Sequence, residues 1–86
     1  MYTITDRGVA CSEVGLSDLG SSEDCSDAVK YATSFNEKAF FSGVEAYSPL
    51  NHKGCYILDE GAMYFNSYVT GKNNRKARTI CKNGNM

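Results

Sequence analysis

The stretch that decides the fold runs from Cys55 to Phe65 and reads CYILDEGAMYF. Its two halves, 55–58 and 62–65, are rich in aromatic and β-branched residues, which favour strands. Asp59-Glu60-Gly61 separates them, and a short connection that ends in glycine suits a β-hairpin with a positive φ at that glycine. The sequence therefore predicts an antiparallel hairpin here.

Further extended segments are predicted on both sides of this hairpin. Alternation in 2–5 predicts a short first strand, and 78–82 predicts a last strand that returns to the sheet. Residues 39–47 predict another strand, in which Gly43 marks a bulge or bend. We therefore expect an antiparallel sheet of four to five strands.

One helix is predicted from about Ser22 to Ser34. Ser21 or Ser22 can cap its start, and three acidic residues then follow at the positive end of the helix dipole. Small residues at i, i+3, i+4 and i+7 form one narrow apolar stripe, which lets the helix approach the sheet closely. These residues are Cys25, Ala28, Val29 and Ala32. The fold class is then α+β, with one helix packed on the sheet and residues 1–86 forming a single domain.

Alternation also divides the hairpin residues between two faces of the sheet. We assign Ile57, Met63 and Phe65 to the core, which leaves Tyr56 and Tyr64 partly exposed. An exposed tyrosine suits an interface, because it is large and stiff and has a polar tip. Ordinary sheet surface is the alternative, since tyrosine has good β-propensity.

Four cysteines, Cys11, Cys25, Cys55 and Cys81, span almost the whole chain of 86 residues. An even number at wide spacing in so short a chain indicates a disulfide framework and an oxidising compartment. Of the three pairings, we favour the nested one. Cys11–Cys81 would then tie the terminal segments together, and Cys25–Cys55 would tie the helix to the sheet.

Other uses of the cysteines have less support. Four buried free thiols in a cytosolic protein remain an alternative, because free cysteine packs as a small hydrophobe. Zinc sites usually pair ligands about two to four residues apart, and no cysteine has a second cysteine that close. The lack of Cys-x-x-Cys also argues against a thioredoxin-type redox role.

The composition argues against several classes of function. A formal net charge of −1 gives no reason to expect nucleic acid, and no apolar run approaches the length of a membrane span. The first residues lack the basic start and apolar core of a signal peptide. We therefore expect a mature form, or one with Met1 added, that is extracellular, lumenal or part of a virion or cell surface.

No residues predict catalysis. His52 has no recognisable nucleophile or orienting partner near it in the sequence. Asp59 and Glu60 are adjacent turn residues, whose carboxylates point apart rather than face one another. Motifs for a nucleophile elbow, a phosphate-binding loop and a calcium loop are absent. We expect no enzymatic activity, cofactor or metal.

Charge is unevenly distributed along the chain. Residues 1–27 carry six acids and a single base, Arg7, whereas residues 72–82 carry five bases and no acid. An anion-binding loop, head-to-tail docking of copies, and a solvated loop that keeps the domain soluble all fit this pattern. The candidate interaction surface combines this loop with the exit of the hairpin: Tyr64, Asn66, Tyr68, Lys72, Arg75 and Arg78.

Several short motifs carry a resemblance to known domains. They are 23–28 (EDCSDA), 54–56 (GCY), 63–66 (MYFN), 70–71 (TG) and 80–82 (ICK). Together they resemble a small cysteine domain of unknown function found in secreted or surface proteins of marine algae and protists. The nested bridges and single helix also resemble a reduced apple or PAN module, an extracellular binding domain, by architecture alone. Neither resemblance implies catalytic residues.

Two functional hypotheses follow. The first is a non-enzymatic structural or interaction module, a subunit of a larger assembly that contacts a protein partner or its own copies. The second is a lectin-like domain that binds anionic glycan through the basic loop 72–82, with Lys72, Arg75 and Arg78 as ligand contacts. A small secreted hydrolase or enzyme inhibitor has the least support from the residues.

Overall fold

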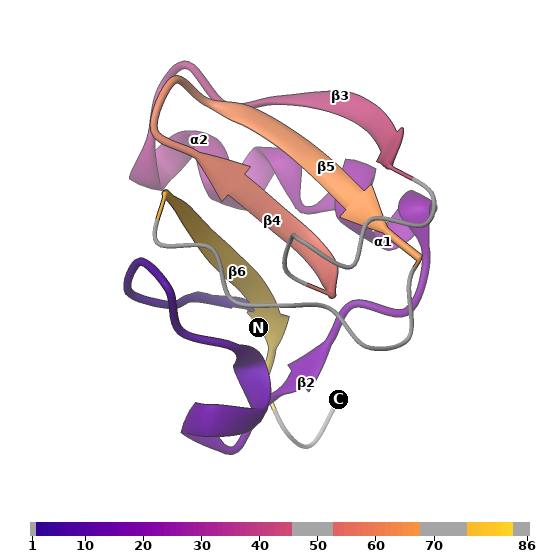
Figure 1. Cartoon of the computed structure of the whole chain (residues 1–86). Helices are drawn as coiled ribbons and strands as arrows, with labels where there is room; N and C mark the ends of the chain where they lie inside the picture. Colours follow the sequence, from indigo (N-terminus) through magenta and orange to yellow (C-terminus); the bar gives the residue numbers. More distant parts are fainter. Residues whose placement is uncertain (1, 46–52, 68–75, 84–86) are drawn as a thin grey trace.

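The computed structural model describes residues 2–45, 53–67 and 76–83. Its strands form one mixed sheet in the order β1-β6-β4-β5-β3, and β2 pairs with β6 off this path. Helices α1 (Ser22–Asp27) and α2 (Val29–Phe35) lie behind the sheet in Figure 1. The other elements are β1 (Tyr2–Ile4), the 3₁₀ helix η1 (Cys11–Val14), β2 (Ser17–Asp18), β3 (Phe40–Glu45), β4 (Gly54–Leu58), β5 (Ala62–Asn66) and β6 (Ala77–Lys82).

The predicted hairpin is confirmed as β4 and β5. The two strands are antiparallel, with Cys55 opposite Phe65 and Ile57 opposite Met63. Gly61 closes the turn with a φ of 101°, and its N–H donates to the Leu58 carbonyl at 2.9 Å. Asp59 and Glu60 are exposed in this turn, as expected for polar turn residues.

The prediction of a purely antiparallel sheet is wrong, because β3 runs parallel to β5. The sheet order places β5 next to β3, while β4 lies on the far side of β5. Parallel neighbouring strands need a long connection, and the chain between β3 and β5 includes the whole of β4. The sheet also has six strands rather than four or five, since the two-residue β2 adds to it. The predicted bulge is present as a register shift between Phe41 and Gly43.

The helix has the predicted start but is broken in the middle. Ser21 caps α1, with its Oγ accepting from the Asp24 N–H at 3.1 Å. Ala28 separates α1 from α2, and its ψ of −8° departs from the helical value of about −42°. The small-residue stripe nevertheless faces the sheet, with Cys25, Ala28 and Ala32 fully buried.

Leucine at position 32 is expected to overpack this interface. Ala32 is 0% exposed beneath the sheet, so Ala32→Leu should lower the free energy of unfolding by about 1–3 kcal/mol. Chemical denaturation followed by circular dichroism would measure the loss. Lys30→Leu, an exposed position on the same helix, is the control and should change stability little.

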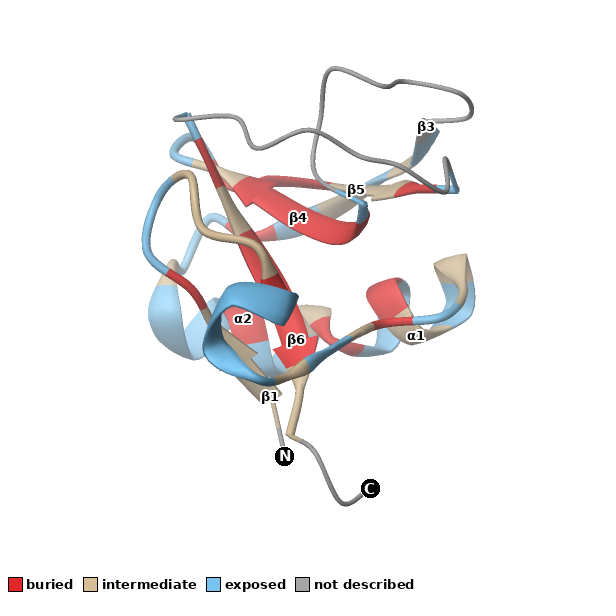
Figure 2. Cartoon of the chain, turned by 60° about the horizontal axis from the view of Figure 1, so that its bottom comes forward, coloured by how far each residue is buried: buried red, intermediate tan, exposed pale blue. Residues whose placement is uncertain are grey.

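The main core lies between the helices and one face of the sheet. Ile57, Met63 and Ile80 are buried there, and Phe65 packs against them in a partly buried position. These assignments confirm the predicted core residues. Figure 2 shows buried residues on β4 and β6, two inner strands of the sheet.

The prediction that Tyr56 is partly exposed is wrong, since only 2% of its surface is accessible. Tyr56 lies on the sheet face opposite the helices, where its ring stacks on the half-buried Tyr64 at 5.6 Å. A simple alternation assumes that one face meets water. Here the N-terminal segment covers part of that second face, as Thr5 and Val9 both hydrogen-bond to Thr79, the residue paired with Tyr56.

Two disulfides hold these layers together with the favoured nested pairing. Cys11–Cys81 joins η1 to β6, and Cys25–Cys55 joins α1 to β4. All four cysteines are fully buried. One bridge therefore fastens the N-terminal segment to the last strand, and the other fastens the helix layer to the centre of the sheet.

Candidate interaction site

Exposed aromatic side chains line the outer edge of α2. Tyr31 and Phe35 stand four residues apart, which places them on the same side of the helix. Their exposed fractions are 37% and 50%. The ring of Tyr2, on the edge strand β1, lies 5.5 Å from the ring of Tyr31. Three aromatic rings from two elements thus form one continuous strip.

Arg78 continues this strip at the end of α2. It pairs with Ile57 in the sheet and shares its helix-facing side, and its guanidinium lies 5.1 Å from the centroid of the Phe35 ring. This geometry allows a cation–π interaction. It also places a positive charge beside the C-terminal residue of α2, where the helix dipole favours it. We call Tyr2, Tyr31, Phe35 and Arg78 the aromatic–arginine surface.

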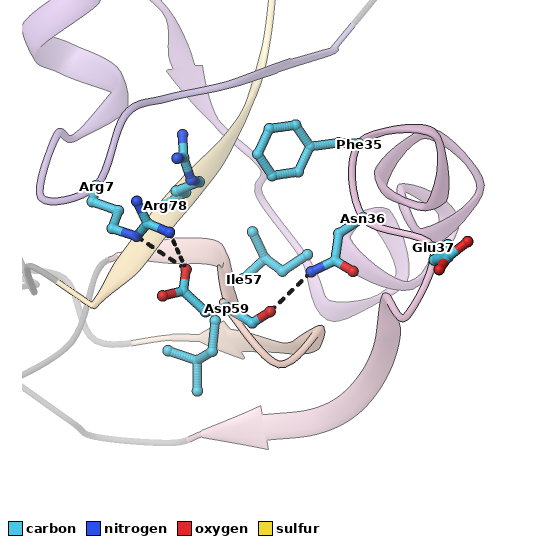
Figure 3. A pocket seen from close by; sticks show the side chains of 8 residues that line it. Arg7, Phe35, Asn36, Glu37, Ile57, Asp59 and Arg78 are labelled. Atoms are coloured by element: carbon cyan, nitrogen blue, oxygen red, sulfur yellow. Dashed lines mark hydrogen bonds and ion pairs between the residues drawn. The ribbon is translucent and has the colours of Figure 1, made fainter.

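A cleft of about 440 Å³ opens beside Phe35 and Arg78 (Figure 3). It lies where the end of α2, the β4–β5 turn, the start of β6 and the loop after β1 converge. Leu58 supplies apolar surface within it, and the buried Ile57 lies beside it. Its complete lining is Arg7, Phe35, Asn36, Glu37, Ile57, Leu58, Asp59 and Arg78.

The side chains of Arg7 and Asn36 fix the turn side of the cleft. Arg7 Nε donates a hydrogen bond to Oδ1 of Asp59 at 3.0 Å, and Arg7 Nη2 forms an ion pair with the same oxygen at 2.9 Å. The side-chain amide of Asn36 donates to the Asp59 backbone carbonyl at 3.1 Å, while its oxygen accepts from the Lys38 N–H at 3.0 Å. These bonds tie the hairpin turn to both the N-terminal loop and the end of α2.

The lining of the cleft is balanced in charge. Two guanidinium groups, Arg7 and Arg78, stand against the carboxylates of Asp59 and Glu37. Arginine and aromatic side chains are residue types enriched at protein interfaces. The cleft can present directional hydrogen bonds and apolar contact area at the same place.

The predicted site residues do not all meet at this cleft. Asn66 is 1% exposed and lies along a second cleft of about 520 Å³, so the expectation that it forms exposed contact surface is wrong. Asn66 is the last residue of β5 and is buried there. Tyr64 is half-buried and stacked on Tyr56. Arg78 is the predicted residue that reaches the first cleft. Tyr68, Lys72, Arg75 and His52 lie outside the described residues.

The charge asymmetry of the sequence is partly neutralised within the fold. Arg78 Nη1 lies 3.7 Å from Asp6, and Lys53 lies 3.9 Å from Asp18. Because β1 and β2 both pair with β6, the acidic N-terminal region lies against the basic last strand of the same molecule. Among the described residues, acidic and basic groups are therefore less separated in space than along the sequence. This weakens the basis for head-to-tail docking of copies.

Sequence reasoning missed Tyr31, Phe35 and Arg7. The two aromatics carried a usable signal, a four-residue spacing beside the apolar stripe, but Phe35 stood just beyond the predicted helix end. Arg7 carried no local signal, because its partner Asp59 is 52 positions away.

Within residues 2–45, 53–67 and 76–83, no three histidine, cysteine or acidic side chains are placed to hold a metal ion. The helices in this part of the chain are also too short and polar to cross a bilayer. No protein-family profile, curated protein or solved structure matches this chain.

Proposed function

We propose that this protein is a non-enzymatic interaction module that contacts other protein chains through the aromatic–arginine surface. The observation that carries the proposal is the continuity of that surface. Single exposed apolar residues are ordinary, but contiguous ones mark contact sites. Aromatic residues and arginine are the types most enriched at such sites.

The scaffold suits this role. Tyr31 and Phe35 lie on α2. The adjacent helix α1 is joined to β4 by the disulfide Cys25–Cys55. Arg78 lies on β6, which is joined to η1 by the disulfide Cys11–Cys81. Contact residues on rigid elements lose little conformational freedom on binding. The two disulfides are consistent with an oxidising compartment, so we place the module in an extracellular or lumenal assembly or on a virion or cell surface.

Self-assembly is the first form of this proposal to test. Sedimentation velocity over a range of concentrations should show a mass above that of the monomer for the wild type. Phe35→Ser should reduce this association at least about tenfold, since it removes an exposed ring at the centre of the surface. Phe40→Ser is the matched control, because Phe40 is 51% exposed and Phe35 is 50% exposed.

Two results would decide against self-assembly. Equal association of the two serine variants would show that the aromatic–arginine surface is not the contact. A wild-type protein that stays monomeric at every concentration would restrict the proposal to a different protein partner.

A lectin-like domain that binds anionic glycan is the alternative. Arg78 and the exposed ring of Phe35 favour it, because sugars can stack on an aromatic face while their anionic groups meet a guanidinium. Retention on a sulfated glycan column that falls with salt and is lost in Arg78→Ser would support this alternative. Retention that survives replacement of Lys72, Arg75 and Arg78 by serine would exclude it.

A further inference from the structure

We propose that the cleft contains a carboxylate-binding subsite at Arg78, which the side chain of Asp6 faces in the free protein. Its ligand is an aspartate or glutamate side chain flanked by apolar residues on a partner protein. This inference rests on the proposed protein-contact function and names the chemistry of the segment that the surface recognises.

Arg78 is held in position by contacts that leave much of its binding capacity unused. Its Nη1 donates to the Thr5 carbonyl at 3.2 Å, and its guanidinium stacks near the Phe35 ring. Neither Nε nor Nη2 has an acceptor among the residues that the structure describes. A guanidinium presents five N–H groups in a planar fork that matches a carboxylate. The side chain is only 21% exposed, so a bond made there is partly shielded from water.

Asp6 faces Arg78 without binding it firmly. The distance from its Oδ1 to Nη1 of Arg78 is 3.7 Å, which is too long for a hydrogen bond. Its side chain is 95% exposed, and ion pairs with so exposed a partner contribute little. An incoming carboxylate can therefore displace Asp6 from Arg78 at small cost.

The second arginine of the cleft is arranged differently. Arg7 makes two contacts of 2.9 and 3.0 Å with Asp59, and the backbone of Asp59 is itself bonded to Asn36. A ligand would have to break a well-formed pair to reach Arg7. The geometry therefore points to Arg78 as the group that receives the ligand's carboxylate, with the Arg7–Asp59 pair forming a wall beside it.

The surroundings of Arg78 indicate which groups lie next to the carboxylate in the ligand. Phe35 and Leu58 provide apolar surface within the cleft, and the exposed ring of Tyr31 continues this surface along α2 beyond the cleft. The strip is longer than one sugar ring would need and suits an extended segment with apolar side chains next to its acid. The observations therefore favour an acidic–apolar protein segment over an acidic glycan.

The probe is the capped tripeptide acetyl-Leu-Asp-Phe-amide, whose aspartate is its only carboxylate. Titration into ¹⁵N-labelled protein, followed by NMR of backbone amides and arginine Nε–H groups, should shift the signals of Arg78 and Phe35. Asp6→Asn removes the internal competitor and should tighten binding about two- to fivefold. Arg78→Gln should weaken it at least about tenfold.

Three controls keep the test specific. Lys30→Gln makes the same charge change at an exposed site on α2 and should leave affinity unchanged. Arg78→Lys keeps the charge but loses the planar fork, so weakened binding by this folded variant would assign the effect to geometry. The tripeptide with Asn in place of Asp should bind at least about tenfold more weakly than the acid.

The outcomes separate this inference from the proposed function. Equal binding of the Asp and Asn peptides at Phe35 would leave the apolar contact in place and overturn the carboxylate subsite. An unchanged affinity in Asp6→Asn would overturn the role of Asp6. Binding of neither peptide, with a wild-type protein that remains monomeric, would count against both. An oligogalacturonate that binds at Arg78 when the peptide does not would show that the ligand is a glycan.

Discussion

The double variant Cys11→Ala/Cys81→Ala is expected to lose about 4 kcal/mol in its free energy of unfolding. The Cys11–Cys81 bridge joins residues 70 positions apart, so removing it restores a large conformational freedom to the unfolded chain. Both cysteines are fully buried, and alanine would also leave unfilled space between η1 and β6. A small domain has about 5–15 kcal/mol of stability in total, so this loss should remove a large fraction of it.

Urea denaturation followed by circular dichroism and tyrosine fluorescence would measure this effect. Ser12→Ala, an exposed neighbour on η1, controls for disturbance of the 3₁₀ helix and should change the midpoint little. If the double variant kept the wild-type midpoint, the disulfide would not be what fastens the N-terminal segment to β6. The covering of the second sheet face would then need a different explanation.

The features that the sequence predicted well are those with a short-range signature. The hairpin follows from two strand-forming runs around Asp59-Glu60-Gly61, and the bulge follows from Gly43. The helix start follows from Ser21 and the acids after it. The nested disulfides also agreed with expectation, because a helix cysteine on an apolar stripe has to face the sheet.

The features that the sequence did not predict depend on contacts between distant residues. Nothing in residues 40–45 shows that β3 will pair with β5 in the parallel direction, since this choice depends on the order of strands across the sheet. The burial of Tyr56 depends on a second covered face that alternation along β4 cannot reveal. Alternation along β5 likewise does not predict the burial of Asn66.

The candidate site was predicted only in part. The basic run 72–82 predicts Arg78 as a site residue. The surroundings of its guanidinium, however, depend on Phe35 at the end of α2 and on Asp6 after β1. These three residues come from separate elements that meet only in the folded chain. Charge counting along the sequence showed an excess of bases near Arg78, whereas the fold brings acids from the N-terminal region beside it.

Gly61→Ala is expected to destabilise the protein by about 3 kcal/mol, through two separable effects. The φ of 101° at this position is unfavourable for any residue with a side chain, and such strain costs about 1–3 kcal/mol. In addition, a Cβ at Gly61 would overlap the backbone carbonyl of Lys38, so either the turn or the segment before β3 has to move. The Asp59 carboxylate, one wall of the cleft, would move with the turn.

Two other glycines separate these effects in the same denaturation experiment. Gly15 has a φ of 74° with no atom within 4 Å of an added Cβ, so Gly15→Ala should show the cost of strain alone, about 1 kcal/mol. Gly20 has neither a positive φ nor a close neighbour, so Gly20→Ala should be neutral or slightly stabilising. If Gly61→Ala cost no more than Gly15→Ala, the close packing of the turn against Lys38 would contribute nothing. The hairpin turn would then be free to shift, and the Arg7–Asp59 pair could not hold the cleft in a fixed shape for a ligand at Arg78.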